Sequence, residues 1–285
     1  MAAALRVLMT LLVLAAALCG QEQQVPTPKP GWPCVAGRAV DPSYVSTAEA
    51  TGGQVFLFDR SEAARSMVLV GVAGKHEDTL FRATGTLSTG LREFTFPVDS
   101  TVESLMVSVT LQCLQSITAY RPSSTEVHSG EPGADDNRFR SGRILILAHP
   151  DAGMWRIKIA GAGMFFVVAQ AKSSISLDNV EFVEPGGRPG HEGLFPVKGP
   201  LHLGEKRMLS VRMRAPRGEA TFRQVNSAGE TLEALDLKLS DQSSEDRAFL
   251  GTLTLKHSAF RLAVEGRDEA GYPYQRVLPR LIQIN

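Results

Sequence analysis

Apolar and polar residues alternate with a period of two over most of this chain, and no other feature restricts its fold as strongly. Between Leu105 and Gln112 every second side chain is apolar, and the same pattern returns around Trp155, Leu209 and Phe260. Strands of this kind have one buried and one solvated face. Turn residues separate the runs at about 8 to 15 residues, which predicts a mainly β protein of two tandem antiparallel β-sandwich (immunoglobulin-like) domains.

Glycine and proline punctuate this β region. Their densest cluster, Glu184–Gly190, predicts the domain boundary, so we expect the first sandwich over 83–183 and the second over 184–285. Gly161–Gly163 lies between two apolar runs and is interpreted as a hairpin turn.

The first 20 residues have the composition of a cleavable secretory signal. Arg6 precedes the apolar run Val7–Leu18, and small residues follow it. The run is shorter than the roughly 20 residues that cross a bilayer, so we expect cleavage near Gly20, secretion, and no stable membrane insertion afterwards. Residues 21–43 contain five prolines and few apolar residues, which is typical of a Pro-rich linker.

Residues 44–82 have a different hydrophobic pattern from the rest of the chain. The short apolar run Gln54–Phe58 predicts one strand, and apolar residues at helical spacing in Ser61–Val70 predict one helix over 61–73. One strand and one helix cannot bury both of their faces alone. Two alternatives follow: the unit docks on the first sandwich, or it stays mobile.

Charge and cysteine content limit the partners and the compartment. Lys plus Arg and Asp plus Glu both total 30 and form no long blocks, so the field that attracts nucleic acid is missing. Cys34 and Cys113 follow the signal, in a compartment that permits disulfides. The sequence leaves open whether they form a bridge or whether Cys113 is a buried free thiol.

The candidate motifs for catalysis or metal binding are incomplete. His76 and His191 each begin a sequence like the zinc motif H-E-x-x-H, but Leu80 and Phe195 occupy the position of the second ligand. Asp135–Asn137 lacks the alternate spacing of a calcium loop. We therefore expect a non-enzymatic protein with no catalytic, cofactor-binding or metal-binding residues.

Three stretches match a known arrangement of modules. Ala48–Phe56 is similar to the last strand of a von Willebrand factor A domain, and the helix expected over 61–73 resembles its closing helix. His149–Lys158, in which Trp155 is predicted to be a core anchor, resembles the strand entry after that domain. Gly266–Val277 resembles the end of the next module. Together they resemble the hemicentin / von Willebrand factor A domain-containing protein 7 family over residues 44–285.

The resemblance implies an extracellular matrix protein whose β modules act as spacers and contact surfaces in cell adhesion. Residues 44–82 would be a C-terminal strand-helix remnant of the adhesion domain, without its metal-binding loop, so metal-dependent adhesion is not carried over. We predict a secreted, non-enzymatic protein that mediates contacts with extracellular proteins or acts as a structural spacer. The alternatives are a hydrolase or hydrolase accessory module, and a truncated isoform without an independent function.

Overall fold

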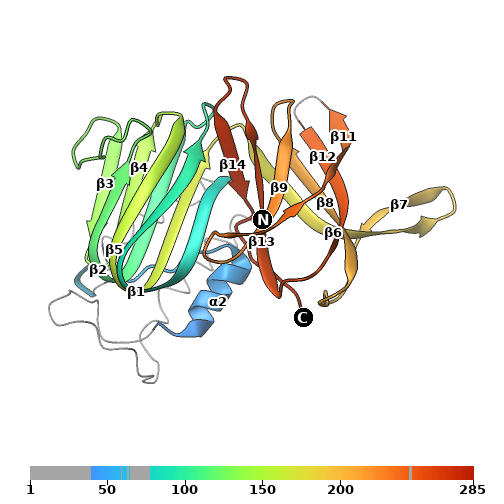
Figure 1. Cartoon of the computed structure of the whole chain (residues 1–285), viewed down its shortest axis with the longest axis horizontal. Coiled ribbons are helices and arrows are strands. Elements are labelled where there is room, and N and C mark those ends of the chain that lie inside the picture. Colours follow the sequence, from blue (N-terminus) through green and yellow to red (C-terminus); the bar gives the residue numbers. More distant parts are fainter. Residues whose placement is uncertain (1–39, 59, 63, 65–77, 244–245) are drawn as a thin grey trace.

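The computed structural model describes residues 40–58, 60–62, 64, 78–243 and 246–285. The predicted signal peptide, nearly all of the linker and most of the helix expected over 61–73 lie outside these residues. The described part is mainly β and contains two short helices, α2 (Pro42–Thr51) and the 3-10 helix η1 (Arg60–Glu62). Neither is long and apolar enough to cross a membrane. Figure 1 shows two β domains side by side, with α2 next to their junction. The predicted mainly β, antiparallel fold class is confirmed.

The first domain is one antiparallel sheet that folds over on itself. Its strands, in the order β1-β5-β2-β4-β3, are β1 (Asp78–Val98), β5 (Gly153–Lys172), β2 (Ser104–Tyr120), β4 (Gly142–Ala148) and β3 (Ala134–Phe139). The rings of Phe81 and Phe96, both on β1, lie only 5.8 Å apart, whereas a straight strand would separate them by about 50 Å. The two layers of this domain are therefore halves of the same strands.

Glycines produce the bend. Gly161–Gly163, interpreted from the sequence as a hairpin turn, instead lies inside β5, opposite Gly90 of β1. Gly161 has a φ of 152°, and a Cβ there would lie 2.2 Å from the Cys113 carbonyl oxygen. The hairpin interpretation is wrong because glycine also allows a strand to bend sharply where another backbone approaches it.

The second domain consists of two packed sheets. Its strands are β6 (Ser176–Arg188), β7 (His191–Pro196), β8 (Lys206–Arg214), β9 (Ala220–Val225), β10 (Thr231–Leu235), β11 (Lys238–Ser243), β12 (Asp246–Thr254), β13 (Ala259–Arg267), β14 (Pro273–Val277) and β15 (Ile282–Gln283). The sheets have the orders β11-β12-β8-β6-β7 and β10-β9-β13-β14, and β15 pairs with β13. With β6 and β8 as strands A and B, these orders are those of the immunoglobulin fold, with two extra strands, β10 beside C and β7 beside A. Phe222 and Phe249 meet between the sheets, with ring centroids 4.8 Å apart.

The domain boundary differs from the prediction. The first sheet ends at Lys172 and β6 begins at Ser176, so the chain changes domain at 173–175. The Gly/Pro cluster Glu184–Gly190 lies in the β6–β7 hairpin, where Pro189 and Gly190 (φ 81°) form the turn. The cluster misled the prediction because Pro-Gly is a turn signal within a hairpin as much as a linker signal between domains.

Residues 40–58 form a strap across the outer face of the first sheet. Asp41 caps α2 by accepting from the Ser43 N–H, and Gly52 (φ 76°) ends the helix. The strand predicted over Gln54–Phe58 is wrong, since no strand is assigned there. Gln54 instead bonds to side chains of the sheet, accepting from Ser108 at 2.6 Å.

The strap crosses a face of the sheet, where no strand backbone is free to form ladder hydrogen bonds. Its side chains therefore make the contacts with the sheet. Val55 packs with Phe166 of β5, and Phe58 meets Phe139 edge-on at 4.9 Å. Residues 40–58 are thus docked on the first domain. Most of the expected helix over 61–73 lies outside the described residues, so the choice between the two alternatives is decided for residues 40–58 alone.

Candidate functional site at the domain junction

The described residues hold no group of three or more His, Cys, Asp or Glu side chains placed to bind a metal ion. Of the motifs considered in the sequence, His191 lies on the exposed strand β7, and His76 lies outside the described residues. Asp136, from the acidic cluster on β3, is bound by Arg143 at 2.7 Å and by Arg138 at 2.9 Å. Burial opposes ionisation of Asp136, but these two arginines outweigh it and lower its pKa. This acidic cluster is structural.

Two of the three residues singled out as structural, Cys113 and Trp155, lie in the first domain. Cys113 on β2 is buried and disulfide-bonded, which excludes the free-thiol alternative. Cys34 lies outside the described residues, so its pairing with Cys113 stays a prediction. Trp155 is 1% exposed within the first core, and its indole N–H donates to the Asp151 carbonyl at 2.8 Å.

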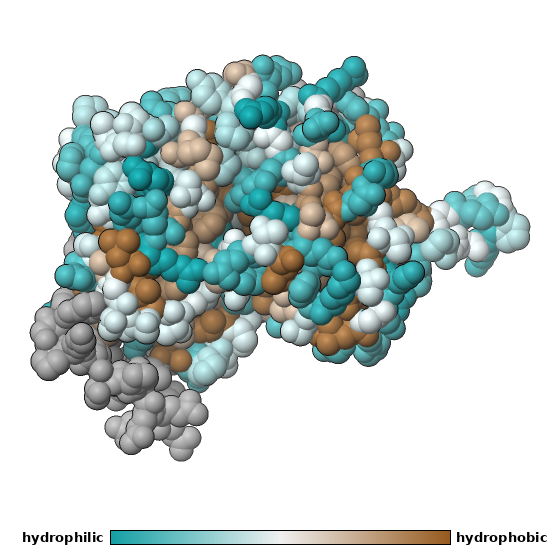
Figure 2. Space-filling view, in the orientation of Figure 1, coloured by the Kyte–Doolittle hydropathy of each residue, from teal (hydrophilic) through white to brown (hydrophobic). Residues whose placement is uncertain are grey.

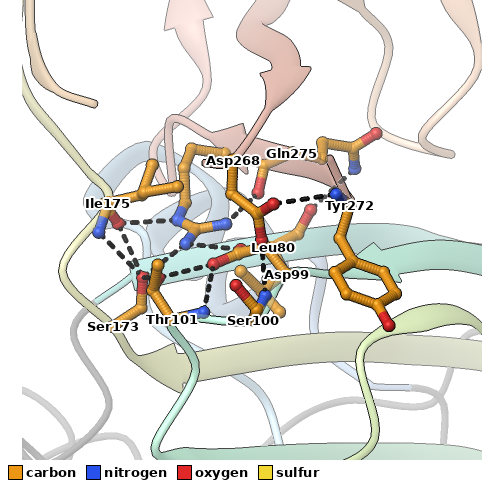
Figure 3. Close-up of polar contacts among 10 residues, drawn as sticks. Leu80, Asp99, Ser100, Thr101, Ser173, Ile175, Asp268, Tyr272 and Gln275 are labelled. Atoms are coloured by element: carbon orange, nitrogen blue, oxygen red, sulfur yellow. Dashed lines mark hydrogen bonds and ion pairs between the residues drawn. The ribbon is translucent and has the colours of Figure 1, made fainter. Parts of the chain in front are cut away.

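The most distinctive polar site in the described residues is the junction between the two domains. There β1 runs next to β14, and side chains bridge them: the Gln275 amide donates to the Leu80 carbonyl at 2.6 Å (Figure 3). A backbone bond from the Thr84 N–H to the Ser227 carbonyl, 2.7 Å long, adds a second link. The junction is therefore sealed by directional bonds as well as by packing.

A buried arginine from β14 organises one end of the junction. Arg276 Nη2 lies 2.8 Å from Oδ2 of Asp99, in the loop after β1. Its Nε donates to the Ile175 carbonyl at 2.8 Å, and Nη2 donates to Ser173. Figure 3 shows Asp99, Ser173 and Ile175 gathered around this point. One guanidinium thus ties together the first domain, the connecting segment and the second domain.

Asp268 adds a contact in which the second domain supplies the carboxylate, whereas in the Arg276 contact the first domain supplies it through Asp99. It accepts from the Ser100 N–H at 2.7 Å and from the Tyr272 N–H at 2.8 Å (Figure 3). Burial opposes its ionisation, but these hydrogen bonds favour the carboxylate and lower its pKa. Asp268 is therefore held ionised across the junction.

Helix α2 closes the junction from a third direction. The Glu49 carboxylate accepts from Arg82 of β1 at 2.9 Å and from Thr84 at 3.0 Å, and its second oxygen pairs with Arg261 of β13. The backbone carbonyl of Glu49 also accepts from the Leu281 N–H at 2.7 Å. A single helical residue thus links both domains.

The electrostatics of this triad favour the ionised form of Glu49. Burial opposes ionisation of Glu49, but Arg261 and Arg82 outweigh it and lower its pKa. Burial lowers the pKa of Arg261 to about 10, against the opposing influence of Glu49. Glu49 and Arg261 are therefore both charged near neutral pH. The arrangement holds two domains in one orientation, and its carboxylates are occupied by structural partners.

A second prominent feature lies at the far end of the second domain. The β6–β7 hairpin projects from the body (Figure 1), and the space-filling view shows it as a narrow arm (Figure 2). Every residue of β7 is exposed, including Leu194 at 46% and Phe195 at 47%. This hairpin offers an accessible contact element.

The sequence prediction missed the junction arginines. Alternation assigned Arg261 to a solvated face, yet it is 0% exposed, because α2 covers that face. The available signal was an arginine inside an apolar run, as in Phe81-Arg82-Ala83 and Phe260-Arg261-Leu262. A charged residue in such a position is almost never fully buried unless paired.

One family model matches part of the chain. Residues 79–174 match the hemicentin galactose-binding domain-like family. The first domain is a hemicentin-like region. The matched span coincides closely with the bent sheet, from β1 to the connecting segment, so this part of the predicted resemblance is confirmed.

Comparisons with solved structures give weak likenesses. Bacillus licheniformis lipase BlEst2 in its propeptide form shows 14% identity and a TM-score of 0.33, covering 73% of this chain and 42% of that one. Mouse nectin-like molecule 4, full ectodomain, shows 13% identity and a TM-score of 0.22, covering 69% and 64%. The titin Ig tandem A164-A165 shows 13% identity and a TM-score of 0.20, covering 72% and 98%. The chain thus spans under half of the lipase, and no curated protein matches it significantly.

Proposed function

We propose that this chain is a rigid two-domain spacer and contact module of a secreted, non-enzymatic extracellular protein, with other extracellular proteins as its partners. The observation that carries the proposal is the junction, where Glu49 bridges Arg82 and Arg261 between the domains. A spacer needs a fixed angle between its modules. Charged groups with buried partners supply that angle, since moving the domains apart would strand them.

The hemicentin-like region and the immunoglobulin topology support an extracellular contact role. The disulfide at Cys113 supports an oxidising compartment. In this proposal residues 40–58 serve as the strap that completes the first domain, in place of a strand-helix remnant of an adhesion domain. Secretion, cleavage near Gly20 and the absence of nucleic-acid partners belong to the same proposal.

The spacer role is tested by measuring distances between the domains. Spin labels at the exposed positions Ser123 and Glu219 report on the first and second domain, respectively. We expect one narrow distance distribution in the wild-type protein and a broader one in Glu49→Gln. A distribution that is already broad in the wild type would refute the rigid spacer.

The contact role is tested separately. The full chain is expressed in secreting cells, its mature N-terminus is sequenced, and the purified protein is applied to an array of extracellular proteins. We expect a start near Gln21 and saturable binding to at least one array protein. Retention inside the cells, or an array without any saturable signal, would contradict this half of the proposal.

A further inference from the structure

The β6–β7 hairpin outgrows the sheet to which it belongs. Strand β8 accompanies β6 only as far as Val183, which pairs with Met208. From Glu184 onward the only described neighbour of β6 is β7, and the only described neighbour of β7 is β6. We call residues 184–196 the ribbon. An isolated two-stranded ribbon is marginally stable in water, so this one needs further pairing to be well formed.

The two edges of the ribbon differ in the backbone donors that they offer to a further strand. The Val197 N–H donates to the Phe182 carbonyl, so these two residues point their backbone groups toward each other. In an antiparallel pair the direction alternates from residue to residue, which fixes the inward and outward positions along both strands. By alternation, Pro185 and Gly187 face the outer edge of β6, and only Gly187 has an N–H there. Glu192, Leu194 and Pro196 face the outer edge of β7, and the first two have an N–H. The edge of β7 therefore offers more donors than the edge of β6.

We propose that β7 pairs antiparallel with β7 of a second copy of this chain, about a twofold axis at Gly193. The two ribbons would form a four-stranded sheet between the copies, which gives each ribbon the extra strands it lacks. Formal charge does not oppose this association, since the chain has a net charge of zero. The proposal goes beyond the spacer role and does not depend on it, because the ribbon lies outside the domain junction.

The residues of β7 select the register. An axis at Glu192 would place two glutamates directly opposite each other, which is unfavourable. An axis at Leu194 would place Pro196 opposite Glu192, and proline has no N–H for the ladder. An axis at Gly193 avoids both problems within β7, because Pro196 then lies opposite Gly190, which precedes the strand. Each Glu192 pairs with Leu194 of the other copy, and the two residues exchange N–H···O=C hydrogen bonds.

The same register predicts a specific covalent link. Gly193 would face its own equivalent in a non-hydrogen-bonded pair, with Cα atoms about 4.5 Å apart, within the range of a disulfide. A Cβ at Gly193 meets only an ordinary contact with Phe195, so a cysteine fits there. We expect Gly193→Cys to give a dimer on a non-reducing gel. The matched control His191→Cys, with about 13 Å between equivalent positions, and the wild type should stay unlinked.

Sedimentation of the full chain supplies an independent test. The wild type should be a dimer, Leu194→Ala should keep the N–H and still associate, and Leu194→Pro should be monomeric with an unchanged circular dichroism spectrum. A wild type that is monomeric up to about 100 µM, or equal linking of Gly193→Cys and His191→Cys, would overturn the proposal. Capture of a different protein by the ribbon of a monomeric chain would overturn it too. When labelled chains are diluted with unlabelled ones, the spin labels report distances within one chain only. These distances are unaffected by the outcomes above, so failure here is distinct from failure of the spacer role.

Discussion

The substitution Glu49→Gln removes one charge from the domain junction while keeping the size of the side chain. It leaves the guanidinium groups of Arg82 and Arg261 buried, with side chains 1% and 0% exposed, and without their counter-charge. Removal of one partner from a buried ion pair costs about 3 to 5 kcal/mol. Because total stabilities of domains are about 5 to 15 kcal/mol, we expect a loss of a large fraction of the free energy of unfolding.

Urea unfolding followed by the fluorescence of Trp155, which is buried in the first core, measures this loss. The matched control is Glu230→Gln, at the rim of the same junction. Glu230 pairs with Arg92 at 3.1 Å but is 64% exposed, so its loss should cost less than about 1 kcal/mol. If both substitutions cost the same, or if Glu49→Gln costs under about 1 kcal/mol, the reasoning that the triad fixes the domains would be refuted.

Three further outcomes are expected. Gly161→Ala should destabilise the protein by about 1 to 3 kcal/mol through overpacking against a backbone oxygen, whereas Gly218→Ala, at nearly the same φ of 151° but with open space around it, should cost less; thermal unfolding compares them. The Glu49 pKa is lowered below 4.5 by folding, so its stabilisation is complete above pH 4.5 and is lost as pH falls through the folded value; the stability gap to Glu49→Gln should narrow on acidification. Cys113 should resist alkylation until a reductant is added, and peptide mapping should identify its predicted partner, Cys34.

The sequence predicted strands better than it predicted their faces. The alternation over Leu105–Gln112 corresponds to β2, but Met106 and Ser108, on the face expected to be solvated, are buried. They are covered by the strap, and alternation describes a strand without describing what packs on it. The same limit applies to Arg261, which is covered by α2. The two faces of a strand follow from the local sequence, whereas the burial of each face depends on segments that are distant in the sequence.

Local signals also had more than one structural meaning. The boundary at 173–175 contains no glycine or proline, because the domains are joined by a short connection that Arg276 holds by hydrogen bonds to Ser173 and Ile175, and not by a flexible linker. The prediction missed helix α2, which begins within the expected linker 21–43. Its ends carried a signal all the same, since Asp41 before Pro42 and Gly52 after the last turn are typical helix ends. The glycines of Gly161–Gly163 could not be assigned to a bend without knowing that β1 and β5 pair along their whole length.

The triad at the junction also orders events in time. Glu49 enters the growing chain early, but Arg261 is added only near the end of synthesis, and β1 pairs with β5 across most of the first domain. Domains generally fold as units during synthesis, beginning at the N-terminus, so the first domain has all of its strands once residue 172 has emerged. Closure of α2 over both domains must wait for β13. A nascent chain halted between these points would contain all strands of the first domain. In that state Glu49 could pair with Arg82, but Arg261, its partner in the second domain, would not yet have been synthesised.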